Sequence, residues 1–117
     1  MISISCSEKE NDECIDSSIA LITSVNAPSV GVVNEIINIE VDFQVNNGCG
    51  NFARFIESGN INVKTIEVEA EYIGCVCTHD LPIRHVNYKF TPTIVGNYQL
   101  IFKSSETNFI VINISIN

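Results

Sequence analysis

The sequence predicts an all-β domain, an antiparallel β-sandwich of two sheets with about seven strands. Apolar and polar residues alternate with a period of two along most of the chain, and no long window shows a helical period. Hydrophobic residues make up 45% of the 117 residues but aromatic ones only 8%, so Ile and Val must fill the core, and branched side chains favour strands. Turn-forming Asn, Gly and Pro separate the alternating segments at short intervals.

The first two strands are predicted before residue 46. The first strand ends at Pro28, and the residues on one of its faces are Ile19, Leu21, Thr23 and Val25. The second covers residues 37–45 and alternates apolar with polar side chains without interruption. Its inward-facing residues are Ile37, Ile39, Val41, Phe43 and Val45. It should therefore bury one face and leave the other in water.

Three strands follow in the middle of the chain. The turn "NNGCGN" leads into a short strand at residues 52–56, and "ESGN" leads into a longer one at residues 63–74. Along the longer strand Ile66, Val68, Ala70 and Tyr72 face inward, whereas Glu67, Glu69 and Glu71 face outward. A further strand lies around residues 86–90 and ends at Pro92.

The last two strands, "GNYQLIF" and "NFIVINISI", are joined by the polar link "KSSETN" and should form a hairpin. One face of the final strand carries Ile110, Ile112, Ile114 and Ile116. The predicted core consists of Ile39, Val41, Phe43, Ile66, Val68, Tyr98, Leu100, Ile112 and Ile114. A small closed barrel is the alternative architecture for such a set of strands.

Gly96, Tyr98 and Leu100 in "GNYQL" resemble the tyrosine corner of immunoglobulin-like domains. The resemblance implies that the Tyr98 hydroxyl bonds to the chain ahead of its own strand and that Leu100 faces the core. Antibody domains have a Cys where this chain has Leu100, and the chain contains no Trp. The resemblance is therefore to the broad immunoglobulin-like or fibronectin-like class, and it extends over residues 15–117.

The composition excludes several partners. The formal net charge is −8, and the six Lys and Arg residues are scattered singly, so we expect no binding to nucleic acid or to anionic lipid. No segment approaches the roughly 20 apolar residues of a membrane-spanning helix. We therefore expect any link to a membrane to be covalent.

Ile4, Ser5 and Cys6 resemble the end of a bacterial lipobox, in which the cysteine receives lipid. Residues 7–13 are polar and acid-rich and resemble the export signals that follow the lipidated cysteine in surface lipoproteins of Bacteroidetes. This resemblance implies that residues 1–14 are a signal remnant and acidic tether, and that the protein is lipid-anchored through Cys6 at the outer membrane or cell surface. Whether a full signal peptide precedes Met1 stays open.

Four cysteines remain besides Cys6, an even number that predicts two disulfides in an exported chain. Cys49 follows one long strand, and Cys75 and Cys77 follow another, so a bond from Cys49 to either would join two strand ends. Cys14 would take the remaining partner. We favour Cys14–Cys75 with Cys49–Cys77, and the swapped pairing stays open.

A metal or redox site is the alternative interpretation of the same residues. The motif "CVCTH" places Cys75, Cys77 and His79 at alternate positions, and with His85 nearby they could bind Zn²⁺ or Cu(I). The outward-facing glutamates, together with Glu40 and Asp42, could bind Ca²⁺ instead. However, the cysteine spacing differs from that of zinc ribbons, and alternating Glu also protects a strand from edge pairing.

No catalytic set is evident, so we expect a non-enzymatic binding or structural module without a cofactor. Its partner would be an unknown protein or glycan. Recognition should fall on the loops "NNGCGNF" and "CTHDLPIRH", which mix polar and aromatic side chains near the cysteines. The candidate contact residues in these loops are Asn51, Phe52, Asp80 and Arg84.

Overall fold

The computed structural model describes residues 14–117. Within that range the chain forms eight strands and no helix, so the all-β prediction is confirmed. The strands are β1 (Ile15–Asn26), β2 (Val30–Gly31), β3 (Ile37–Gln44), β4 (Gly50–Gly59), β5 (Val63–Ile73), β6 (Ile83–Phe90), β7 (Gly96–Lys103) and β8 (Phe109–Ile116). Most lie where the alternation predicts them, but β2 is additional and β4 is twice as long as expected.

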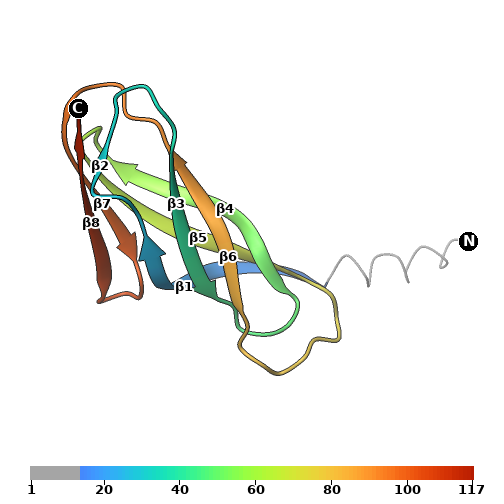
Figure 1. The fold of residues 1–117 in the computed structure, drawn as a ribbon. Coiled ribbons are helices and arrows are strands. Elements are labelled where there is room, and N and C mark those ends of the chain that lie inside the picture. Colours follow the sequence, from blue (N-terminus) through green and yellow to red (C-terminus); the bar gives the residue numbers. More distant parts are fainter. Residues whose placement is uncertain (1–13) are drawn as a thin grey trace, which may run out of the picture.

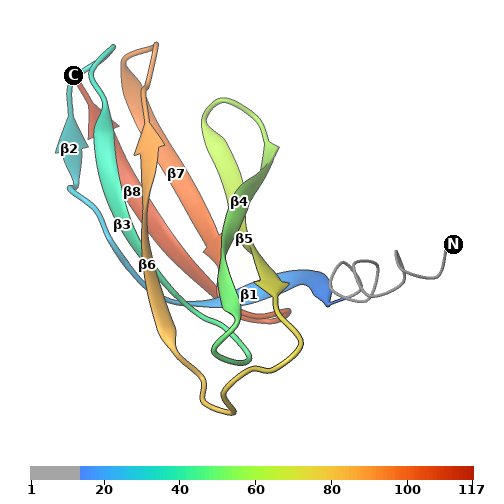
Figure 2. The same ribbon diagram turned by 90° about the vertical axis from the view of Figure 1, so that its right-hand side faces the viewer.

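All eight strands belong to one curled sheet with the order β2-β8-β7-β5-β1-β3-β6, and β4 pairs with β5 off this path (Figure 1). Strand β1 is the link, because residues 15–20 pair with β5 and residues 21–26 pair with β3. The sheet curls at this link, so that β3 and β6 lie across from β5, β7 and β8 (Figure 2). The Tyr88 ring of β6 contacts the Phe102 ring of β7 across the gap, at 5.9 Å between centroids.

The prediction of an antiparallel two-sheet sandwich is wrong in its strand directions, because the sheet is mixed. Strands β5 and β7 pair in parallel, and so do β2 and β8. The physical reason is that a period of two shows which side chains share a face of the sheet but carries no information about which strand lies alongside, or in which direction it runs. Together, the curled sheet and the unpaired edges of β4 and β6 make an open half-barrel.

A β-bulge in β1 separates the residues that the sequence placed on one face. Ile19 and Leu21 are 48% and 47% exposed, whereas Ala20 and Ile22 are buried. The pairing of β1 with β3 shifts its register between Ile22 and Ser24, and after the shift Val25 packs against the core. An extra residue in a strand reverses the inward and outward positions that follow it. Simple alternation therefore fails at this strand.

The core is built from Ile, Val and a chain of aromatic rings. Every predicted core residue is buried except Ile112, which is half-buried and packs against the others. The inward-facing residues of β3 and β5 are all buried, as their alternation predicts. Phe52, Phe55 and Tyr88 link β4 to β6 through ring centroids 4.8 and 5.0 Å apart.

Tyr98 forms the predicted tyrosine corner. Its hydroxyl donates a hydrogen bond to the main-chain oxygen of Ile94 at 2.5 Å and accepts one from the Ile94 main-chain nitrogen at 3.2 Å. Leu100, two residues further on, is fully buried. The hydroxyl thus holds the loop that precedes β7 against the strand it enters.

Arg84 closes one end of the gap between the edges of β4 and β6. Its guanidinium donates to the main-chain oxygens of Gly50 at 2.9 Å and Gly48 at 3.2 Å. Tyr88 fills the gap further along β6, where burial first and then Glu57 raise the pKa of its hydroxyl. Side chains rather than strand pairing therefore join these two edges.

Candidate functional site

Two disulfides brace one end of the half-barrel. Cys14, just before β1, is bonded to Cys75, with 5.0 Å between the Cα atoms. Cys49, just before β4, is bonded to Cys77, with 5.4 Å between the Cα atoms. Both Cys75 and Cys77 lie in the loop of residues 74–82 that connects β5 to β6. This loop is therefore fixed to two other segments of the chain, in the pairing that the sequence analysis favours.

Main-chain hydrogen bonds support the same connections. The Gly74 nitrogen donates to the Cys14 oxygen at 2.9 Å, and the Gly48 nitrogen donates to the Thr78 oxygen at 3.2 Å. The Asn47 side chain accepts a bond from the Cys49 nitrogen at 2.9 Å, which shapes the turn before β4. The loops at residues 45–49 and 74–82 are thus held by covalent bonds and hydrogen bonds together.

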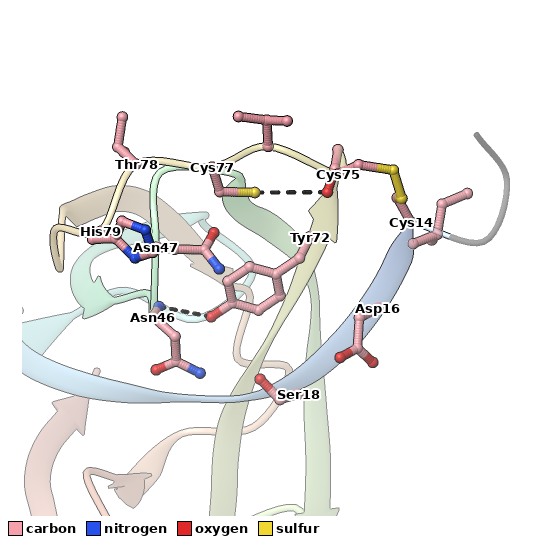
Figure 3. Close-up of a pocket in the computed structure, with 13 residues that line it drawn as sticks. Cys14, Asp16, Ser18, Asn46, Asn47, Tyr72, Cys75, Cys77, Thr78 and His79 are labelled. Atoms are coloured by element: carbon pink, nitrogen blue, oxygen red, sulfur yellow. Dashed lines mark hydrogen bonds between the residues drawn. A yellow bond between two sulfur atoms is a disulfide. The ribbon is translucent and has the colours of Figure 1, made fainter. Parts of the chain in front are cut away.

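Between these loops and the start of β1 lies an open hollow of about 760 Å³ (Figure 3). The Tyr72 ring of β5 lies inside it, and its hydroxyl accepts a hydrogen bond from the Asn46 nitrogen at 2.9 Å. The polar side chains that line the hollow belong to Asp16, Ser18, Asn46, Asn47, Thr78 and His79. Amides, hydroxyls, a carboxylate and an imidazole therefore surround one aromatic ring.

The hollow has the chemistry of a binding site for a polar ligand. Its amides and hydroxyls can both donate and accept hydrogen bonds, while the Tyr72 ring is only 9% exposed and belongs mainly to the core. Val76, which stands between the two bridged cysteines, is 93% exposed at its rim. Next to the hollow, the hydroxyl of Thr78 donates to Asp80 at 2.5 Å, and this bond holds the pKa of the Asp80 carboxyl below its usual value.

The four predicted contact residues have different positions. Asn51 is exposed on β4, and Asp80 is exposed in the loop after β5. Phe52 is half-buried and packs against the core, with its ring 6.2 Å from that of Phe43. The guanidinium of Arg84 is occupied by the two main-chain oxygens at residues 48 and 50. Phe52 and Arg84 thus stabilise the loops through contacts inside the protein, while Asn51 and Asp80 remain accessible.

The structure does not bring the candidate metal ligands together. Cys75 and Cys77 are each bonded to another cysteine, so neither supplies a thiolate. His79 lines the hollow, whereas His85 lies on β6 with its Nδ1 atom 2.5 Å from Oδ1 of Asp42. Within residues 14–117, no group of three or more His, Cys, Asp or Glu side chains is placed to hold a metal ion.

The outward-facing acids are divided between two regions of the sheet. On β5, Glu67 pairs with Lys103 at 3.2 Å, and Glu69 pairs with Arg54 at 2.7 Å. On β3, Glu40 accepts a hydrogen bond from Asn26, and Asp42 contacts His85. Because these carboxylates have partners of their own on separate strands, the structure does not assemble the oxygen cluster that Ca²⁺ prefers.

The sequence did not predict Asp16, Ser18 or Tyr72 as site residues, whereas Asn46 lies in the predicted recognition loop "NNGCGNF" but was not among its named contact residues. Asp16 and Ser18 precede the predicted first strand, and Tyr72 is predicted only to face inward. The signal that could have found them is the bond from Cys14 to Cys75, since it brings the start of β1 beside the end of β5. Cys6 lies outside the described residues.

Comparisons with protein-family models, with curated proteins and with solved structures find no match to this chain. In residues 14–117, no helix is long and apolar enough to cross a membrane.

Proposed function

We propose that the protein is a non-catalytic binding module of the bacterial envelope, anchored by lipid on Cys6, which binds a protein or glycan partner at the disulfide-braced hollow. The observation that carries this proposal is the convergence of three chain segments, held by two disulfides, around a polar hollow. Loops on a rigid sheet are the usual place for recognition. Bridged loops bind with a smaller loss of conformational entropy than free ones.

The disulfides also support an oxidising compartment outside the cytoplasm, because thiols in the cytosol are kept reduced. Both bonds join segments that are distant in the sequence, at separations of 61 and 28 residues. Closing loops of these lengths stabilises a folded chain by about 3 to 4 kcal/mol each in the chain-entropy model. Such bonds suit a small exported domain.

The proposed anchor places the hollow close to the membrane. Eight residue steps separate Cys6 from Cys14, and even a fully extended chain of that length spans at most about 29 Å. Since Cys14 is bonded to Cys75 at the rim of the hollow, the partner should be a molecule that reaches the narrow space above the lipid. The opposite end of the domain, where the C-terminus lies, would face away (Figure 1).

We also propose that the fold is a divergent immunoglobulin-like one. The tyrosine corner at Tyr98 and the two facing parts of the sheet support this relationship. The parallel pairing of β5 with β7 differs from the antiparallel arrangement of that class.

A photocrosslinking residue tests the binding site in cells that export the full chain. Placed at Val76, which is 93% exposed at the rim, it should capture a partner when the cells are irradiated. The matched control is the same residue at Val95, which is 61% exposed in the loop between β6 and β7. Adducts at both positions alike, or at Val95 alone, would contradict the proposed site.

The anchor has its own test, so its failure can be distinguished from failure of the binding site. Cells fed a tagged fatty acid should label the full chain, and Cys6→Ser should abolish the label and release the protein from the membrane fraction. Label that persists in Cys6→Ser would overturn the anchor and leave the hollow untouched.

A further inference from the structure

We propose that two copies of this chain form a two-fold dimer through the free edge of β8, with the two β8 strands antiparallel and Val111 at the axis. The edge of β8 is a different surface from the hollow, and its pairing does not depend on the lipid anchor. The strand pairing, the hydrogen-bond direction and the charge of β8 support the dimer.

Strand β8 has a partner along its whole length on only one side. It pairs with β7 from Phe109 to Ile116 without a register shift. On its other side, β2 pairs only with Ser115 and Ile116. Among the described residues, no strand pairs with that side of β8 from residue 109 to residue 114. This stretch is therefore an open sheet edge.

The direction of the main-chain groups along this edge follows from bonds at both ends. The Ser115 and Asn117 nitrogens donate away from β7, to the oxygens of Ser29 at 2.9 Å and Gly31 at 3.0 Å. The Ser104 nitrogen donates to the Asn108 oxygen at 2.9 Å, so even-numbered residues of this strand bond toward β7. Because the direction alternates along a strand, the odd-numbered residues point their N–H and C=O groups outward.

The outward groups at Phe109, Val111 and Asn113 are complementary to those of a second copy. When two β8 strands run antiparallel about Val111, each Val111 faces the other, and Phe109 faces Asn113 of the second copy. All three facing pairs are of the hydrogen-bonded kind, which gives about six main-chain bonds. Strand β2 covers the edge beyond residue 114, so it excludes registers displaced toward the C-terminus.

The edge also lacks the features that prevent strands from pairing between molecules. The sequence of β8 is FIVINISI, which contains no charged residue, no Pro and no Gly. The other long edges differ: β4 carries Arg54, Glu57 and a bulge, and β6 carries Arg84 and Lys89. Charges and bulges are the usual protection of an exposed edge. Among the long sheet edges of residues 14–117, β8 lacks both, and this points to an edge that is covered by another copy.

The side chains beside the axis favour a second copy as the occupant. Phe109 is 51% exposed and Val111 is 47% exposed, and both project from the outer face of the sheet. In the dimer the two Val111 side chains meet across the axis, with each Phe109 diagonal to them. A closed two-fold contact of this kind uses the same patch on both copies and stops at two. The contact is small, so we expect association at micromolar rather than nanomolar concentrations.

The test is the mass of the full, oxidised chain in solution, measured by sedimentation at concentrations up to about 1 mM. Every protein measured carries Cys6→Ser, so that neither lipid nor an intermolecular disulfide at residue 6 contributes to the mass. We expect the mass to rise from 12.9 kDa to twice that value. Val111→Lys puts two like charges opposite each other at the axis and should weaken the dimer at least about tenfold. The matched control is Leu21→Lys, which has the same 47% exposure on β1 and should leave the dimer intact.

A charge swap separates a broken dimer from a damaged fold. Val111→Glu alone should weaken the dimer as Val111→Lys does, whereas an equal mixture of Val111→Glu and Val111→Lys should associate more tightly than either variant alone, through opposite charges at the axis. A monomer at all concentrations would overturn the proposal. So would a dimer that Val111→Lys leaves unchanged, or a mixture that associates no more tightly than either variant alone although both variants are folded.

Discussion

Arg84 on β6 donates a hydrogen bond from its guanidinium to the main-chain oxygen of Gly50 at 2.9 Å, and this contact joins two strands that do not pair with each other. A second bond reaches the oxygen of Gly48 at 3.2 Å. Gly48 and Gly50 flank Cys49, one of the bridged cysteines. Arg84 therefore joins the unpaired edges of β4 and β6 next to the candidate site.

Arg84→Ala should lower the free energy of unfolding by about 1–3 kcal/mol, because two main-chain oxygens lose a charged donor. Urea denaturation of the oxidised protein measures this change. The matched control is Lys89→Ala, an exposed residue of the same strand, which should change stability by less than about 0.5 kcal/mol. Equal effects of the two substitutions would contradict the role of Arg84 in joining the edges of β4 and β6.

Tyr98→Phe should destabilise the protein by about 1–2 kcal/mol while the ring stays buried. The substitution removes the hydroxyl that bonds both the nitrogen and the oxygen of Ile94. Thermal unfolding followed by circular dichroism measures the loss. A change below about 0.3 kcal/mol would show that the corner does not stabilise the loop before β7.

Acid should weaken the contact between Asp42 and His85. The hydrogen bond from His85, then that from Ser24 and the charge of His85, hold the pKa of the Asp42 carboxyl below its usual value, although partial burial opposes them. A carboxyl with a lowered pKa in the folded state stabilises the protein above its unfolded pKa, near 3.8, and loses this contribution as the pH falls through the folded value.

We therefore expect the wild-type chain to lose more stability than Asp42→Asn when the pH falls from 6 to a value below the folded-state pKa of Asp42. The difference should stay within about 1 kcal/mol, because His85 is 75% exposed and solvent screens the pair. Urea denaturation at each pH measures it. Parallel curves for the two proteins would mean that the contact adds nothing to stability.

Sequence alternation predicted which residues are buried where the strands are regular, as in β3 and β5. It failed in β1, where the bulge near Ser24 reverses the faces, and it could not reveal that β5 and β7 run parallel. Both depend on contacts between segments distant in the chain, and local patterns do not encode these contacts. At the candidate site, the sequence located the bridged loops but missed Asp16 and Ser18, because only the fold brings the start of β1 to that end.

Two disulfides hold the loops of the proposed exported binding module, and peptide mapping by mass spectrometry without reduction can detect both of them. The sample is the full chain isolated from the membrane fraction of the cells that make it. We expect peptides linked through Cys14–Cys75 and Cys49–Cys77, and a lipid-modified Cys6. Free thiols at Cys75 and Cys77, with or without bound Zn²⁺, would contradict this expectation.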